Sequence, residues 1–268
     1  MSRLFPRDRL LLRWLSRTVI GLGILLASWL ALSAFQKIVF GVMIIPDPLS
    51  TIAAIGPLVT NGIYGITLIE HVGMSFARVL LGFFFALLLA VPFGLFLGLS
   101  NHGRQIFEPA MDLIRPIPPI AWVPVAIILF GLTMFSYAFI IFIGAFFPLV
   151  QNIIDGVRRV KPVYRDVALS LGASRLDVIR SIILPAITPN ILTGARVSMG
   201  ISWMCVIAAE MIGVSDGGIG YFINDMKNIG NYVYMMAGML MLAVVGLGIS
   251  MFFLVLERYI IKWVETIS

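Results

Sequence analysis

Residues Asp166–Pro185 spell DVALSLGASRLDVIRSIILP, a charge-bearing segment between long apolar runs. Pro162, just before it, suits the first position of a helix, and Gly172 suits the left-handed residue that ends one. Ser174 and Asp177 have capping-box spacing, so a second short helix should begin there and stop at the closing proline. The segment therefore predicts a helix–glycine–helix knuckle. Its shape suits docking into a groove on a soluble partner, but an ordinary structured loop remains an equal alternative from these residues alone.

The rest of the chain has the composition of a membrane protein. Of its 268 residues, 60% are hydrophobic and only 12% are charged. Such a chain lacks the polar surface of a soluble domain, and it contains runs that could cross about 30 Å of hydrocarbon. The prediction is an all-α polytopic fold with six transmembrane helices. These lie near Thr18–Phe35, Val79–Leu99, Ile120–Leu132, Ser136–Val150, Ile191–Ile212 and Val233–Leu256. Thr188 and Pro189 are expected to start the fifth helix.

The distribution of Lys and Arg predicts the orientation. Only Lys37, Arg78 and Lys227 of the 19 basic residues fall on one side of the six spans, and the others fall on the opposite side. Positive residues favour the cytoplasmic side, so both termini and the loop 155–188 should be cytoplasmic. We therefore divide the chain into a tail at 1–17, a transmembrane domain at 18–260 and a tail at 261–268. The first apolar run is expected to be retained as a helix, and Asp47-Pro48 indicates another helix start before the second span.

Several function classes have no support in the sequence. The net charge of +6 comes from short basic segments between apolar runs, which does not suggest a nucleic-acid-binding face. The single cysteine, Cys205, excludes a disulfide framework within the chain. We expect no metal site, because no His, Asp and Glu residues have ligand spacing. We also find no nucleophile–base arrangement and no Gly-x4-Gly-Lys-Ser/Thr phosphate loop, so an ATP site would have to lie in another subunit.

A polar stripe enters the second predicted span. His71, Ser75, Arg78 and Gly82 fall on one face of a helix. One interpretation is that the stripe faces a translocation pathway and meets an anion. The other is that it anchors the helix at the membrane interface, with Arg78 extending to the headgroups.

The fifth predicted span carries its own polar residues. Glu210 and Arg196 share a face but lie about 21 Å apart along the axis, so each needs a partner on another helix or subunit. A structural ion pair or hydrogen bond is favoured for Glu210 over a role in an outer gate. Ser198 and Ser202 belong to a small-residue face that suits helix packing or a pore lining. Gly94 and Gly98 form a close-packing motif in the second span.

The knuckle also resembles a known family element. Asp166-Val167-Ala168, Gly172 and Ile182-x-Leu184-Pro185 are similar to the EAA loop of ABC import permeases, in which Glu-Ala-Ala is followed by three residues, Gly, nine residues and Ile-x-Leu-Pro. The spacing from the glycine onward matches in full. The departures are Asp166 for Glu, which keeps the charge, and Val167 for Ala.

Other segments resemble nitrate/sulfonate/taurine/bicarbonate permeases in particular. They are the stripe from His71 to Phe83, the Arg115-Pro116-Ile117-Pro118 and Ala121-Trp122-x-Pro124 region with Phe130-Gly131, and Ala209-Glu210 followed by Gly218-Ile219-Gly220-Tyr221. The first forty residues show no such resemblance. The resemblance also does not indicate which of these substrates is transported.

The resemblance implies a permease with a type I ABC importer fold, paired with a second copy in an expected homodimer. Two ATP-binding subunits would hold ATP and Mg, and an extracytoplasmic binding protein would deliver a small anion. The residues implied in ATPase coupling are Asp166, Ala168, Gly172, Ala173, Ser174, Leu184 and Pro185. The candidate pathway residues are His71, Ser75, Arg78, Ser198, Ser202 and Glu210. The alternatives are a stand-alone secondary carrier, which should show more ionisable residues within its spans, and a non-transporting membrane scaffold.

Overall fold

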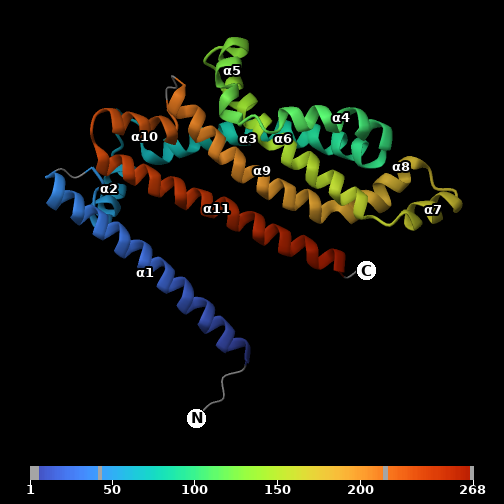
Figure 1. Cartoon of the computed structure of the whole chain (residues 1–268), viewed down its shortest axis with the longest axis horizontal. Coiled ribbons are helices and arrows are strands. Elements are labelled where there is room, and N and C mark those ends of the chain that lie inside the picture. Colours follow the sequence, from blue (N-terminus) through green and yellow to red (C-terminus); the bar gives the residue numbers. More distant parts are fainter. Residues whose placement is uncertain (1–5, 42–43, 214–216, 266–268) are drawn as a thin grey trace. The chain divides into compact units, whose positions relative to one another are not determined.

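The computed structural model describes residues 6–41, 44–213 and 217–265. Within them the secondary structure is helical, apart from one isolated bridge between Ile63 and Ile66. The helices are α1 (Pro6–Phe40), α2 (Pro48–Thr60), α3 (Leu68–Leu99), α4 (Asn101–Ile114), η1 (Pro119–Trp122), α5 (Val123–Phe130), α6 (Met134–Arg159), α7 (Pro162–Ser170), α8 (Arg175–Val178), η2 (Ile179–Ile183), α9 (Leu184–Ile212), α10 (Ile219–Asn228) and α11 (Tyr232–Glu265) (Figure 1). Arg3 and the last residues of the predicted C-terminal tail, 266–268, lie outside the described residues.

Among the described residues, five helical segments are long and apolar enough to cross a membrane. They are Val19–Val39, Leu68–Leu99, Met134–Arg159, Arg175–Ile212 and Tyr232–Ile260. The span expected at Ile120–Leu132 consists of η1 and the short helix α5, which together follow α4 at a bend of 86°. Pro116, Pro118 and Pro119 explain the break, since proline removes backbone donors and restricts the residue before it. The described residues give six membrane crossings if α4 and the η1–α5 segment together form one bent span.

The chain folds as two compact units. One contains the residues up to 68 together with 223–240, and the other contains 69–222 and the residues from 241 onward. In the first unit, the Trp29 indole of α1 donates to the Pro46 carbonyl over 2.9 Å, which links α1 to the start of α2. Asp47 caps α2 as predicted, accepting from the Ser50 amide at 2.9 Å. The hydrogen bonds from the Ser50 amide and hydroxyl hold the pKa of Asp47 below its ordinary value.

In the second unit, α3 packs closely on α6. A Cβ built on Gly94 would lie 2.8 Å from the Ile153 side chain, and one built on Gly98 would lie 2.7 Å from Val157. Gly82 similarly faces Ile141 at 2.6 Å. The glycines therefore allow the two backbones to approach, and the predicted close-packing motif at Gly94 and Gly98 is confirmed.

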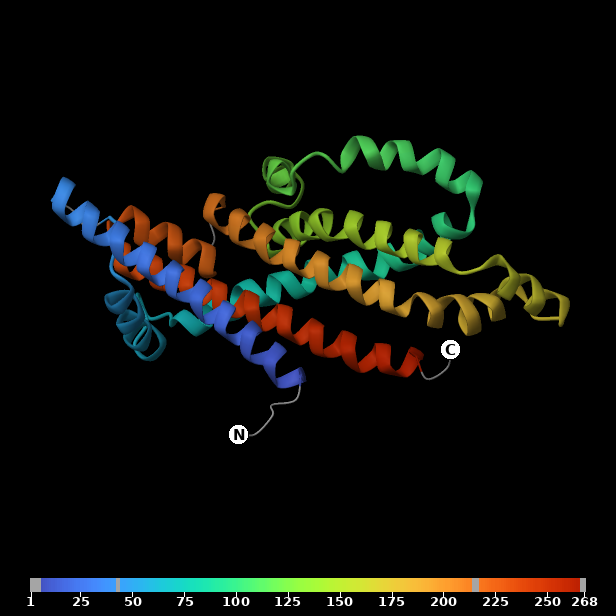
Figure 2. The ribbon, with the colours of Figure 1, turned by 60° about the horizontal axis from the view of Figure 1, so that its bottom comes forward.

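The other face of α6 packs along α9, and the two helices lie side by side in both views (Figures 1 and 2). A Cβ added to Gly194 of α9 would lie 2.8 Å from the Asn152 side chain, and one added to Gly144 of α6 would lie 2.8 Å from the Cys205 sulfur. The Ser198 hydroxyl donates to the Ala145 carbonyl over 2.9 Å. The small-residue face of the fifth predicted span is thus buried against α6.

The start of α9 differs from the prediction. Instead of stopping at Pro185 and restarting near Thr188 and Pro189, the helix runs on from Arg175 to Ile212. One π-type turn, η2, precedes the proline, and there the Leu184 amide bonds to the Ile179 carbonyl five residues back. The wider turn lets the helix continue through a residue that cannot donate to its ladder, so the predicted stop at Pro185 and the predicted restart are wrong.

Candidate functional site

The knuckle, residues 162–185, is held by local hydrogen bonds. Gly172 has φ +90°, the left-handed conformation predicted for it. The Ala173 amide donates to the Ala168 carbonyl over 3.0 Å across this turn. The predicted capping box is also present, because the Asp177 amide donates to the Ser174 hydroxyl at 3.2 Å and the Ser174 amide donates to the Asp177 carboxylate at 3.0 Å. The helix–glycine–helix geometry is therefore confirmed.

The inner side of the knuckle is attached to the membrane helices. Ala168 and Ala173 are half-buried and pack against an apolar cluster. The core of that cluster is Ile153, Val157, Val178, Ile183 and Ile187. Four of the seven predicted coupling residues, namely Asp166, Gly172, Ser174 and Pro185, are exposed, whereas Ala168, Ala173 and Leu184 are partly buried. The inward-facing alanines support the knuckle from beneath, and the exposed residues are available to a partner.

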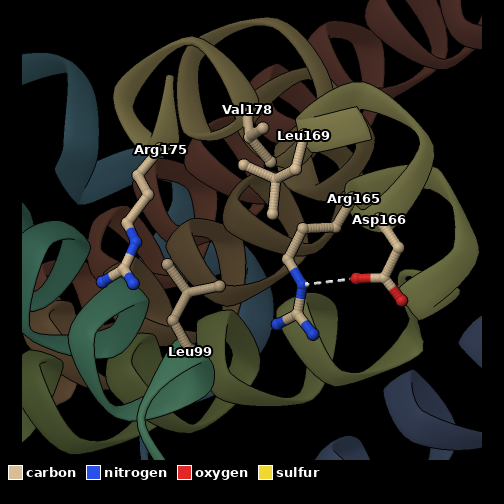
Figure 3. Close-up of a pocket in the computed structure, with 6 residues that line it drawn as sticks. All are labelled: Leu99, Arg165, Asp166, Leu169, Arg175 and Val178. Atoms are coloured by element: carbon tan, nitrogen blue, oxygen red, sulfur yellow. Dashed lines mark hydrogen bonds and ion pairs between the residues drawn. The ribbon is translucent and has the colours of Figure 1, made fainter. Parts of the chain in front are cut away.

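The outer side of the knuckle exposes apolar side chains. Leu171 is 83% exposed, and Val163, Tyr164, Val167 and Leu176 are each more than half exposed. Along α7 and its C-cap, Ala168 packs inward, whereas Val167 and Leu171 point outward. The Arg165–Asp166 ion pair, with 3.4 Å between its atoms, lies on the same helix, α7 (Figure 3). An exposed apolar surface of this kind is typical of a protein-binding site.

A second group, the buried polar cluster, consists of His71, Ser75, Arg78 and Glu210. The Glu210 residue is 1% exposed, yet it carries an ionisable carboxylate. Arg78 Nη1 lies 2.5 Å from Glu210 Oε1, and the Ser75 hydroxyl lies 2.8 Å from Oε2. The Gly220 amide donates to Oε2 over 3.0 Å. The carboxylate therefore has partners on α3 and on α10.

The same cluster holds the backbone of residues 217–219, where α10 begins. Arg78 donates to the Gly217 carbonyl over 2.8 Å, the Gly218 amide donates to His71 Nδ1 over 3.2 Å, and the Ile219 amide donates to the Ser75 hydroxyl over 2.8 Å. Two motifs that the sequence presents separately, the stripe on α3 and Gly218–Tyr221, thus form one site. The Arg78 guanidinium also lies 4.6 Å from the centre of the Tyr137 ring, a cation–π distance.

The packing around the cluster leaves no room for larger residues at its glycines. Gly218 has φ +116°, and a Cβ there would lie 2.6 Å from Arg78 Nη1. A Cβ on Gly220 would lie 2.9 Å from the Glu210 side chain. The glycines at 218 and 220 are therefore required by the close approach of the backbone to the ion pair.

Both charged residues of α9, Arg196 and Glu210, find partners on other helices, as their separation predicted. Glu210 pairs with Arg78 of α3, and Arg196 pairs with Glu257 of α11 at 3.0 Å. Thr193 donates to the same Glu257 carboxylate over 2.9 Å. Of the six candidate pathway residues, Arg78 retains 14% side-chain exposure, and the others are buried. Ser198 and Ser202 donate to backbone carbonyls within α6 and α9.

Comparison with known proteins identifies the family. The profile of the binding-protein-dependent transport system inner membrane component matches residues 90–266. The chain belongs to this family. It is a multi-pass membrane component of such a transport system, and the type I importer fold expected from the resemblance is confirmed.

The relatives and solved structures agree. The chain is similar to a taurine transport system permease protein of Escherichia coli, with 34% identity over 95% of this chain and 94% of the relative. It is 33% identical to a nitrate import permease protein of Synechococcus elongatus, over 79% of this chain and 76% of the other. A chain of the MetNI methionine ABC transporter has a similar fold, with a TM-score of 0.65 at 17% identity, covering 72% of this chain and 95% of that chain.

Proposed function

We propose that the chain is the permease subunit of an ATP-driven importer that moves a small anion from a binding protein into the cytoplasm. The proposed substrates are nitrate, a sulfonate such as taurine, or bicarbonate. Support comes from relatives named as taurine, nitrate and bicarbonate permeases, of which the bicarbonate permease of Synechococcus elongatus is 34% identical over 70% of this chain and 68% of the relative.

A separate ATPase subunit docks on the outer side of the knuckle and supplies ATP and Mg binding. The exposed apolar side chains at Leu171 and its neighbours carry this proposal, because they extend from a segment anchored beneath by the Ala168 and Ala173 contacts. Asp166, Gly172, Ser174 and Pro185 belong to the same segment, and Leu184 begins the helix that continues from it. ATP-driven movement of the ATPase would then displace α8.

The complete transporter contains two permease copies, two ATPase subunits and one substrate-binding protein. Both termini and the loop 155–188 face the cytoplasm, with tails at 1–17 and 261–268 flanking the transmembrane domain 18–260. The excess of Lys and Arg on that side supports this orientation.

The pathway role proposed for His71, Ser75, Arg78, Ser198, Ser202 and Glu210 depends on helix movement. These side chains are largely buried among α3, α6 and α9. They reach a substrate only when the contact between α3 and the 217–220 segment opens, or when α9 separates from α6. A structural role for the Arg78–Glu210 pair requires no such movement and is the simpler interpretation of its geometry.

The docking proposal is tested by affinity purification from native membranes. Gly172→Trp and Leu171→Glu should each abolish co-purification of the ATPase while the permease stays in the membrane. Gly65→Trp is a matched control, because Gly65 also has a positive φ (+82°) and open space around it but lies in the turn before α3. Leu49→Glu is the control for added charge, since Leu49 is 78% exposed on α2.

The outcomes separate the possibilities. Loss of the ATPase with the knuckle variants alone supports docking at this surface. Equal loss with the Gly65 and Leu49 controls would indicate general damage to the permease, and unchanged co-purification with all four would contradict the proposal. The binding protein that accompanies the wild-type complex should then be titrated with nitrate, taurine and bicarbonate to identify the substrate.

A further inference from the structure

Two adjoining cavities lie where the knuckle meets the ends of α3 and α6. One has a volume of about 310 Å³ and is lined by Leu99, Arg165, Asp166, Leu169, Arg175 and Val178. The other has a volume of about 150 Å³ and includes Arg158 and Lys161. Both share Leu99 and Arg165, so they form one continuous lining, which we name the basic pocket.

The basic pocket lies at the level where two membrane spans end. The uncharged stretch of α3 from Val79 to Leu99 is roughly 30 Å long at 1.5 Å per residue, the thickness of the hydrocarbon core. The charged residues Arg158 and Arg159 end α6, whose Val157 also lines the smaller cavity. Leu99 and Val157 therefore mark the hydrocarbon boundary, and the cationic lining begins immediately beyond it.

The charge of the pocket is strongly positive. Arg158, Lys161, Arg165 and Arg175 contribute four cations to the lining, against the single carboxylate of Asp166. Arg165 and Asp166 pair at 3.4 Å, with side chains 48% and 63% exposed. Among the residues that the structure describes, no carboxylate lies within ion-pair distance of the other three cations. The lining therefore has cationic groups available for an external anion.

The pocket also has an apolar side. Figure 3 shows the guanidinium groups of Arg165 and Arg175 flanking Leu99, with Leu169 and Val178 lying together beside them. Arginine binds phosphate through paired hydrogen bonds, and basic pockets between spans at a membrane surface bind anionic headgroups. A fully hydrated free anion would gain nothing from the leucine and valine side chains, whereas an amphiphile would.

We propose that the basic pocket binds an anionic phospholipid, with its phosphate between Arg165 and Arg175 and the start of its acyl chains along Leu99. The lipid would join the ends of α3 and α6 to the inner side of the knuckle. The pocket lining does not include the exposed apolar residues proposed to contact the ATPase, although Asp166 belongs both to the lining and to the proposed coupling residues. It therefore does not depend on the identity of the transported substrate or on ATPase docking.

The test uses the full chain in nanodiscs of equal phosphatidylglycerol and phosphatidylcholine, followed by native mass spectrometry of the retained lipids. Wild-type protein should retain phosphatidylglycerol in preference to phosphatidylcholine. Arg165→Gln and Arg175→Gln should each lower that preference about fivefold, the effect of one cation near an anionic surface. Arg180→Gln is the matched control, because Arg180 is exposed on the same helical run but lines neither cavity.

Each outcome decides the proposal. Equal retention of the two lipids by the wild type, or an equal loss with Arg180→Gln, would overturn it. Displacement of phosphatidylglycerol by about 10 mM inorganic phosphate would assign the pocket to a soluble anion instead. Lys161→Gln should lower the preference to a similar degree and serves as a second variant if an arginine variant unfolds. No ATPase is present, so failure here leaves the docking proposal unaffected.

Discussion

The knuckle and the buried polar cluster both use side chains to hold backbone amides, but over very different distances in sequence. The Ser174 hydroxyl accepts from the amide of Asp177, three residues away, whereas the Ser75 hydroxyl accepts from the amide of Ile219, 144 residues away. The knuckle bonds are exposed to water, and the cluster bonds are buried. Water can replace the first kind when they break but not the second, so similar hydrogen bonds should differ in their contribution to stability.

The largest expected effect is that of Glu210→Gln. Removing this carboxylate leaves Arg78 largely buried without its counter-charge, which should destabilise the protein by about 3–5 kcal/mol. Thermal unfolding in detergent measures the loss. The double variant Arg78→Gln/Glu210→Gln should recover part of the stability, because no unpaired charge remains. A loss under about 1 kcal/mol for the single variant would mean that water reaches the pair, and the contrast with the knuckle would fail.

Two glycines with positive φ sharpen the comparison. Gly218→Ala should cost about 3 kcal/mol, since backbone strain is added to contacts with Arg78 and Glu210. Gly172→Ala should cost only about 1 kcal/mol, because a Cβ there has nothing within 4 Å. The same unfolding measurement applies to both. Equal losses would show that strain alone determines the effect and that packing around the ion pair contributes nothing.

Two serines allow a similar comparison of hydrogen bonds. Ser75→Ala should cost about 2 kcal/mol, because it removes a donor to Glu210 and leaves the buried Ile219 amide unpaired. Ser174→Ala should cost about 1 kcal/mol or less, the usual loss of an exposed helix cap. Hydrogen exchange should place the second change in α8 alone. Faster exchange at Ile219 in the Ser174 variant would contradict the independence of the two regions.

The smallest effect is expected for Arg196→Gln. Its pairing with Glu257 joins distant helices, as in the cluster, but the two side chains are 32% and 17% exposed. The loss should therefore be about 1 kcal/mol or less, and it should shrink further as salt is added. A loss comparable with that of Glu210→Gln would show that sequence separation, not burial, determines the energy of these pairs.

Local signals were sufficient to predict much of the fold. The apolar runs located the membrane helices, and Gly172, Ser174 and Asp177 gave the knuckle geometry because turn and cap requirements act within a few residues. Pro185 is an exception to the rule that proline ends a helix. The π-type turn before it lets the helix continue. Near the third predicted span, the sequence showed the prolines, but it did not predict the 86° bend between α4 and the η1–α5 segment.

The contacts of the buried polar cluster could not be derived in the same way. The sequence showed that Glu210 and Arg196 need partners, since charges in membrane helices are costly, but several basic and acidic residues could have served. Which pairs form depends on how α3 and α11 lie against α9. Likewise, the pattern did not show that Leu171 and Val167 point outward while Ala168 packs inward, because that depends on the position of α6.

The unbroken run from Arg175 to Ile212 has a mechanical consequence. One helical segment carries both the start of α8 in the knuckle and, near its other end, Glu210. The π-type turn at Ile179–Ile183 is the irregular point where this segment could bend. A tilt of about 10° at that point would swing the far end of α9, roughly 43 Å away, by about 8 Å. A small displacement near Arg175 would thereby become a larger displacement near Glu210.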